Sequence, residues 1–164
     1  VSYAHYASDM SRTIPVNGRF TPRQREVYNA LLRIQRVAKN ILRPWILLKD
    51  YHTQVGEAIS KELIDLQLLN MDDVRHQDEK SPAYKKYCPH GISHFIGLDV
   101  HDVGDVYQPL QTGMVLSCEP GIYIPEEWIG IRLENEILLT EDGCIDLMEH
   151  IPIEVEEIEE KMSH

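Results

Sequence analysis

Three acidic residues lie within or beside apolar stretches of this sequence, where a carboxylate is costly to bury. Asp9 follows a strand-like run, Glu119 stands just before Pro120, and Glu134 ends an apolar segment. A buried carboxylate is stable only when it is paired or binds a metal ion. Carboxylate oxygens suit divalent ions such as Mn²⁺, and a carboxylate that bridges two ions is common in hydrolytic centres. We therefore expect these three acids to be metal ligands.

Three histidines fall between positions 90 and 101, among apolar residues and glycines. Residues an even number apart share one face of a strand, so a regular strand would direct His90 and His94 to the same side. His101 lies at an odd offset from His94. It would reach the same cavity only if a turn or bulge intervenes, and we place that turn at Gly97. His94 is the histidine that we expect to join the three acids as a ligand.

Residues 90–102 resemble the signature of the proline-specific metallopeptidases, aminopeptidase P and prolidase, in their C-terminal catalytic domain. Segments 6–13, 118–123 and 131–134 are similar to three further segments of that family. The resemblance covers residues 1–143. It implies the pita-bread fold, an α+β architecture in which helices cover the outer side of a curved antiparallel sheet.

The resemblance also implies a metal centre and a role for each of its ligands. Asp9 and Glu134 would bridge two divalent ions, and His94 and Glu119 would bind one of them. We expect Mn²⁺, although the same ligands accept Co²⁺, Zn²⁺ or Fe²⁺. The family has a further Asp whose position would fall before Val1, so the second ion would lack its own ligand and this stretch of chain could be inactive by itself.

The implied reaction is hydrolysis of the peptide bond before proline, by a hydroxide that the metal ions activate. Glu119 would move a proton to the departing nitrogen, and His101 would stabilise the tetrahedral intermediate. His90 and His101 would line the substrate pocket, and Arg132 and Tyr123 would hold the carboxylates and the pocket in position. The resemblance also places His90 and Arg132 among the catalytic residues. The implied enzyme is an Xaa-Pro aminopeptidase or an Xaa-Pro dipeptidase, acting on peptides with proline as the second residue.

Two helices are predicted ahead of the strands. Thr21 is a suitable N-cap, Pro22 suits the first helical position, and apolar residues then recur at intervals of three and four until Pro44 ends the helix. A second helix is predicted from about residue 49 to residue 70. The polar stretch 71–86 is predicted to be a loop.

Strands are predicted after these helices and at the start of the chain. Residues 1–7 alternate as one arm of a hairpin, and residues 15–18 carry a turn signal. The later strand blocks cover residues 92–101, 114–124 and 129–140. Helices followed by strands indicate an α+β domain with its helices packed on one side of a curved antiparallel sheet. The Glu-rich tail, residues 154–160, is predicted to be a solvated helix face.

The composition limits the class of protein. A chain of 164 residues with 43% hydrophobic and 26% charged residues predicts one globular domain over residues 1–164. A net charge of -11 without a basic stripe argues against nucleic acid as a partner. No segment approaches the roughly 18 apolar residues of a membrane span, so no membrane partner is expected. Cys88, Cys118 and Cys144 lie far apart and indicate reduced thiols, which favours the cytoplasm.

The chain opens in the middle of a strand-like run, without a basic and apolar leader, so we expect a piece of a longer polypeptide. By the resemblance, the N-terminal domain that this chain lacks would limit substrate length and contribute to oligomer contacts. The parent protein would be a homodimer.

Three other interpretations remain open at this point. Cys88 with the three histidines could form a zinc knuckle, but the sequence lacks a paired Cys-x-x-Cys. A methionine aminopeptidase would share the fold and the ligand types, although residues 90–102 fit the proline-specific branch better. A non-catalytic module for binding peptides or proteins could use the same fold without metal.

The sequence departs from the family at two positions. Asn135 could loosen the orientation of Glu134, and Cys118 is expected to be a small buried residue.

Overall fold

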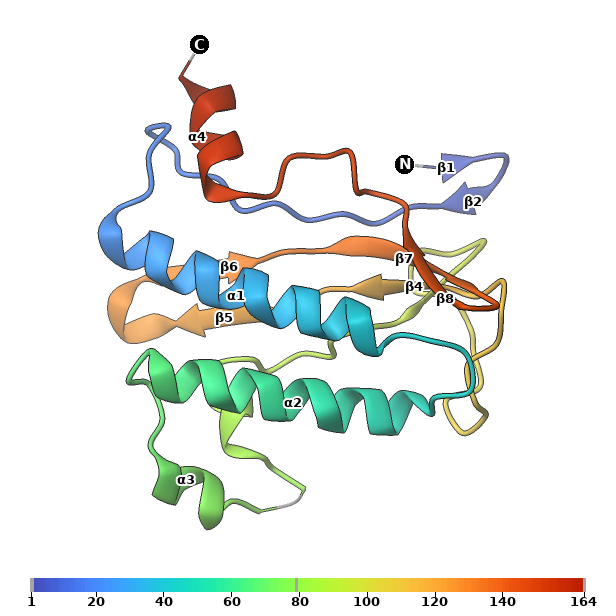
Figure 1. The fold of residues 1–164 in the computed structure, drawn as a ribbon, viewed down its shortest axis with the longest axis horizontal. Helices are drawn as coiled ribbons and strands as arrows, with labels where there is room; N and C mark the ends of the chain where they lie inside the picture. Colours follow the sequence, from blue (N-terminus) through green and yellow to red (C-terminus); the bar gives the residue numbers. More distant parts are fainter. Residues whose placement is uncertain (1, 79, 164) are drawn as a thin grey trace.

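The computed structural model describes residues 2–78 and 80–163. The elements are, in order, β1 (Ser2–Tyr3), β2 (Tyr6–Ala7), α1 (Pro22–Ile41), α2 (Leu48–Asp65), α3 (Met71–Arg75), the 3₁₀ helix η1 (Ala83–Lys86), β3 (Phe95–Ile96), β4 (Val115–Cys118), β5 (Gly121–Ile124), the 3₁₀ helix η2 (Pro125–Glu127), β6 (Ile129–Arg132), β7 (Asn135–Thr140), β8 (Gly143–Asp146) and α4 (Val155–Met162). Helices α1 and α2 pack against each other and lie on one side of the strands (Figure 1). The predicted α+β class is confirmed.

Helix α1 begins where the sequence predicts. The Thr21 hydroxyl accepts a hydrogen bond from the Gln24 N–H at 3.2 Å, and the Gln24 side chain accepts one from the Thr21 N–H at 2.9 Å. This reciprocal capping box satisfies two N–H groups that a helix start leaves free. The helix ends at Ile41, before Pro44. Helix α2 is shorter than predicted, because the chain turns after Asp65 and Gln67 takes a positive φ of 62°.

The stretch predicted as a loop, residues 71–86, contains the short helices α3 and η1, so that prediction was wrong. Asn70 caps α3 by accepting hydrogen bonds from the N–H groups of Asp72 and Asp73. The tyrosine ring of Tyr84, in η1, rests against Gly56 of α2, where a Cβ atom would lie only 2.6 Å from the ring. A glycine in α2 therefore permits this segment to pack closely.

The strands form one antiparallel sheet in the order β3-β4-β7-β8, a separate pair β5-β6 and a small N-terminal hairpin β1-β2. Two expectations fail here. Residues 1–7 are not one arm, because Ala4 and His5 adopt positive φ values of 50° and 68° and turn β1 back into β2. Of residues 92–101, only Phe95–Ile96 is a strand. Strand β8 was not predicted.

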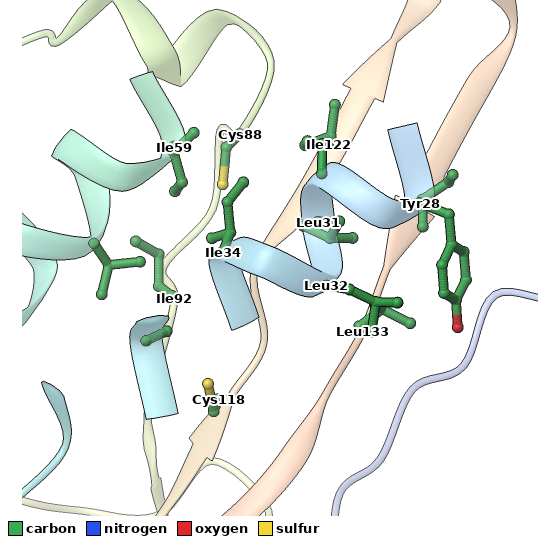
Figure 2. Close-up of a cluster of buried hydrophobic side chains, with 14 of the residues drawn as sticks. Tyr28, Leu31, Leu32, Ile34, Ile59, Cys88, Ile92, Cys118, Ile122 and Leu133 are labelled. Carbon is green, nitrogen blue, oxygen red and sulfur yellow. The ribbon is translucent and has the colours of Figure 1, made fainter. Parts of the chain in front are cut away.

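The hydrophobic core lies between the helices and the strands. Figure 2 shows Leu31 and Ile34 of α1 among Ile59 of α2, Ile122 of β5 and Leu133, which lies between β6 and β7, and these five residues are buried. The burial of this apolar stripe is the main force that fixes α1 against the sheet.

Cys118 of β4 belongs to this core, with no exposed surface. Burial raises the pKa of its thiol to about 12. The Tyr51 hydroxyl donates to the sulfur at 3.8 Å. Cys118 is therefore a small buried residue, as expected. Because side chains alternate along a strand, its neighbours Ser117 and Glu119 point away from the helices.

The Glu-rich tail forms α4, in which Glu156, Glu157 and Glu160 are exposed, as predicted for a solvated helix face, while its other face contacts α1. Val155 and Ile158 are buried beneath it. Arg25 of α1 pairs with two glutamates of α4, at 2.5 Å from Glu156 and 2.7 Å from Glu159. No helix within the described part of the chain combines the length and the apolarity needed to cross a membrane.

Candidate metal centre

Glu119 and Glu134 face each other across an interrupted hairpin. Strands β4 and β5 form one side of it and strands β6 and β7 the other, with two unpaired residues between the strands on each side. The pairs before and after the interruption share one register, and this register places Glu119 opposite Glu134. Two like charges in opposite positions destabilise a sheet, and a cation between them would relieve this repulsion.

The other two predicted ligands come from segments on either side of this hairpin. The Ser117 N–H donates to the His94 carbonyl at 2.9 Å, which holds the segment before β3 beside β4. On the opposite side Glu134 pairs with Ser11, and the Glu134 N–H donates to the Ser11 carbonyl at 3.1 Å. Asp9 lies two residues before Ser11. Four neighbouring segments therefore each bring one predicted ligand to the same place.

The predicted ligand atoms lie within reach of one ion. The His94 Nε2 atom is 3.4 Å from Glu119 Oε1 and 3.7 Å from Asp9 Oδ2. Ligand atoms of His94, Glu119 and Glu134 all lie within 4.8 Å of one another, and so do those of Asp9, His94 and His101. The structure thus brings together the four residues predicted to bind metal, with His101 beside them.

The chemistry of these atoms fits a divalent ion. The His94 Nδ1 atom lies 3.0 Å from the Phe95 carbonyl and donates its hydrogen there, which leaves the Nε2 lone pair free for a metal. His94 Nε2 and Glu134 Oε1 are buried, and neither has a hydrogen-bond partner among the described residues. Burial raises the pKa of Glu134, and the nearby charges of Asp9 and Glu119 raise it further. A bound cation would remove each of these costs.

The turn predicted at Gly97 is present and returns His101 to the site. The Asp102 N–H donates to the Phe95 carbonyl at 3.0 Å, and the Asp102 carboxylate accepts the Leu98 N–H at 2.8 Å. A Cβ atom on Gly97 would lie 1.9 Å from that carboxylate, so the turn requires glycine. The imidazole rings of His101 and His94 lie 4.3 Å apart in an edge-to-face arrangement.

His90 lies at a different part of the site from His94. Residues 90–94 are not a strand, so the alternation argument for these two histidines was wrong. The His90 Nε2 atom accepts a hydrogen bond from the Tyr123 hydroxyl at 2.9 Å, and its Nδ1 atom lies 2.6 Å from the Gly91 carbonyl. A Cβ atom on Gly121 would lie 2.7 Å from the Tyr123 hydroxyl and 2.9 Å from His90 Nε2. This contact explains the glycine after Pro120.

Three partners of the ligands were given no role from the sequence. The Ser11 hydroxyl donates to Glu134 Oε2 at 2.7 Å, Ser117 Oγ lies 3.4 Å from Glu119 Oε1, and Glu136 Oε1 accepts the Asp9 N–H at 2.5 Å. A sequence signal existed. Each of these partners lies two residues from a ligand acid, and residues two apart share one face of a strand.

The Asn135 side chain forms no hydrogen bond with the Glu134 carboxylate among the described residues. Its amide nitrogen donates to both carboxylate oxygens of Asp146 on β8, at 3.0 and 2.9 Å.

The zinc-knuckle interpretation fails, because Cys88 joins neither of the ligand groups found among the described residues. Cys88 is instead fully buried, and this burial raises the pKa of its thiol.

The comparisons with known proteins place the chain in a family. A model named "Metallopeptidase family M24" matches residues 1–141. The chain belongs to metallopeptidase family M24. Members of this family use divalent metal ions, which agrees with the ligand geometry described above.

Curated relatives of this M24 chain include Xaa-Pro aminopeptidases. It is 38% identical to the Xaa-Pro aminopeptidase 3 of Mus musculus, over 94% of this chain and 32% of that protein. It is 40% identical to the Xaa-Pro aminopeptidase of Haemophilus influenzae, over 98% of this chain and 40% of that protein. The chain thus spans between 32% and 40% of the length of these two relatives.

Solved structures agree with the M24 assignment. A putative aminopeptidase P from Bacillus anthracis matches with a TM-score of 0.87 and 38% identity, over 97% of this chain and 36% of that one. The Zn-substituted aminopeptidase P of E. coli in complex with product matches with a TM-score of 0.88 and 37% identity, over 98% of this chain and 39% of that one. The predicted pita-bread fold is confirmed.

Proposed function

We propose that the protein is a metal-dependent Xaa-Pro aminopeptidase, which removes the residue before a proline at the second position of a peptide. The observation that carries the proposal is the pair of buried, unpartnered atoms, His94 Nε2 and Glu134 Oε1, within a group of carboxylates. The names of the curated relatives support aminopeptidase over dipeptidase. A non-catalytic module would gain nothing from holding such atoms without hydrogen bonds.

Asp9, His94, Glu119 and Glu134 would hold the metal in this proposal. Divalent ions bound there would supply a hydroxide at neutral pH and polarise the scissile carbonyl. Mn²⁺ is the ion that we propose, because three of the four ligands are hard carboxylates and one is an imidazole. Co²⁺, Zn²⁺ and Fe²⁺ are alternatives that the same ligands would accept.

Glu119 is the proposed proton carrier. Its Oε1 atom lies 3.4 Å from both His94 Nε2 and Ser117 Oγ, and the residue is only partly buried. A carboxylate in this position can accept a proton from the attacking water and deliver it to the proline nitrogen. His101 is exposed beside His94, where its imidazole would donate to the developing oxyanion.

His90, Tyr123 and Arg132 would form the part of the pocket that receives the proline. The hydrogen bond from the Tyr123 hydroxyl fixes the His90 ring, and the Arg132 side chain is exposed at the edge of the hairpin. A bond before proline has no N–H, so an enzyme cannot hold that bond through a backbone donor. A pocket shaped for the proline ring is a physical answer to this problem.

A homodimeric parent protein and a cytoplasmic location stay predictions. The first rests on family resemblance, and the second rests on the three separated cysteines.

The test is hydrolysis of an Xaa-Pro peptide and of its Xaa-Ala counterpart by the full-length protein with Mn²⁺. We expect cleavage of the Xaa-Pro peptide, and we expect Glu119→Gln to lower kcat by about 100- to 10,000-fold. Glu62→Gln is the matched control, because Glu62 pairs with Arg33 at 2.7 Å on the helix side. Unchanged turnover in Glu119→Gln would refute the proton-carrier role. Preference for the Xaa-Ala peptide would refute the proposed specificity.

A further inference from the structure

Ser11 stands between a proposed metal ligand and a proposed substrate-pocket residue. Its hydroxyl oxygen lies 2.7 Å from Glu134 Oε2. The same oxygen lies 3.1 Å from Arg132 Nε and 3.0 Å from Arg132 Nη2. Backbone pairing between Ser11 and Glu134 fixes this position. One hydroxyl therefore touches both residues.

The direction of the hydrogen bonds follows from the donors available. A guanidinium group has donors and no acceptor, so Ser11 Oγ accepts from Arg132. The single hydroxyl hydrogen is then left for Glu134, whose carboxylate only accepts when it is ionised. A positively charged donor polarises the hydroxyl and strengthens the hydrogen bond that it gives onward. A series of hydrogen bonds thus connects exposed Arg132, through Ser11, to buried Glu134.

This series of hydrogen bonds determines which carboxylate oxygen of Glu134 is free. Oε2 is occupied by Ser11, whereas Oε1 is buried with no hydrogen-bond partner among the residues described. The Arg12 side chain holds the neighbouring backbone, since its Nη1 atom donates to the Glu134 carbonyl at 2.9 Å and not to the carboxylate. Ser11 is thus the described side chain that donates a hydrogen bond to this carboxylate.

We propose that Ser11 is a positioning residue that couples the two halves of the site, so that Arg132 sets metal affinity through the Ser11 hydroxyl. The proposal rests on the proposed function, because it takes Glu134 as a metal ligand. It predicts that a group bound to Arg132 changes metal affinity at Glu134, although the Arg132 guanidinium forms no direct ion pair with that carboxylate among the described residues.

The first experiment measures Mn²⁺ affinity of the full-length protein by titration calorimetry. Removal of a residue that orients a metal ligand costs about 10- to 100-fold in affinity, and we expect this loss for Ser11→Ala. Ser11→Thr keeps the hydroxyl and should restore affinity to within about threefold. Thr13→Ala is the matched control. Within the described part of the chain, the Thr13 hydroxyl bonds only the Arg132 backbone, at 3.0 and 3.1 Å, so its loss should leave affinity unchanged.

The second experiment separates coupling from a simple structural role. Arg132→Gln should weaken Mn²⁺ binding when Ser11 is present and have no further effect in the Ser11→Ala background. Equal effects of Arg132→Gln in both backgrounds, or unchanged affinity in Ser11→Ala, would overturn the proposal. If the unaltered protein bound no Mn²⁺, the proposed function itself would fail, which is a different outcome.

Discussion

Two groups of acidic residues in this molecule differ in how their charge is balanced. Around α4, Glu154 pairs with Arg36, and Glu156 and Glu159 pair with Arg25. At the metal centre, Asp9, Glu119 and Glu134 gather around a histidine, and none of the three forms an ion pair with a lysine or arginine of the described chain. The first group is neutralised by the fold. We propose that the second group takes its cation from solution, and this difference supports its role as the metal site.

The largest effect should come from neutralising an acid at the metal centre. Glu134→Gln should lower Mn²⁺ affinity by more than about 100-fold, because it removes a ligand charge as well as its orientation. The same change should raise the stability of the metal-free protein by about 1 kcal/mol, since a buried carboxylate without a cation is unfavourable. Calorimetry and denaturant unfolding with EDTA measure the two quantities.

Glu156→Gln is the counterpart on α4. Its exposed side chain loses an ion pair with Arg25, so stability should fall by at most about 1 kcal/mol while Mn²⁺ affinity stays unchanged. If both substitutions lowered the stability of the metal-free protein, the two groups would not differ in the way described.

Metal itself should stabilise the fold. At a free Mn²⁺ concentration about 100 times its Kd, binding to the folded state adds about 2.7 kcal/mol, which raises Tm. EDTA should reverse the shift. His94→Ala removes the imidazole ligand and should abolish the response to Mn²⁺. An equal Mn²⁺-dependent rise of Tm in His94→Ala would place the ion elsewhere.

The smallest effect concerns the arginine-neutralised group and depends on pH. The Phe20 N–H and the Arg25 charge lower the pKa of Glu159. A carboxylate with a lowered folded pKa adds stability above its unfolded pKa, and this stability is lost as pH falls through the folded pKa. Arg25→Ala should therefore lower the free energy of unfolding near pH 7 in low salt and have a smaller effect near pH 3. A cost that does not vary with pH or salt would contradict an electrostatic contact.

Much of the fold follows from local signals in the sequence, such as helix-capping residues and prolines. Thr21, Pro22 and Pro44 locate α1, because capping and the missing proline N–H act within a few residues. Helix α4 was predicted as a helix, but its packing on α1 was not, because those contacts join residues more than a hundred positions apart. Strand β8 was missed although it pairs with the adjacent β7 across a tight turn, because the four residues Gly143–Asp146 show too short a pattern to identify a strand. No local pattern reveals the partner of α4.

The ligand group could be predicted because acids in apolar strands are costly and because the segments around them resemble a known family. The partners at Ser11, Ser117 and Glu136 were within reach of the same two-residue alternation that places side chains on a strand face. Alternation along a strand does not predict which group donates and which accepts in each hydrogen bond. That Ser11 accepts from Arg132 and donates to Glu134 depends on how four segments meet in space.

A crystal structure of the full-length protein with Mn²⁺, with data recorded at the Mn absorption edge, tests the central claim most directly. The anomalous signal should lie about 2 Å from His94 Nε2, within bonding distance of the Glu119 and Glu134 carboxylates. A fully occupied Mn²⁺ peak at another position, with His94 Nε2 hydrogen-bonded to protein or water, would contradict the account.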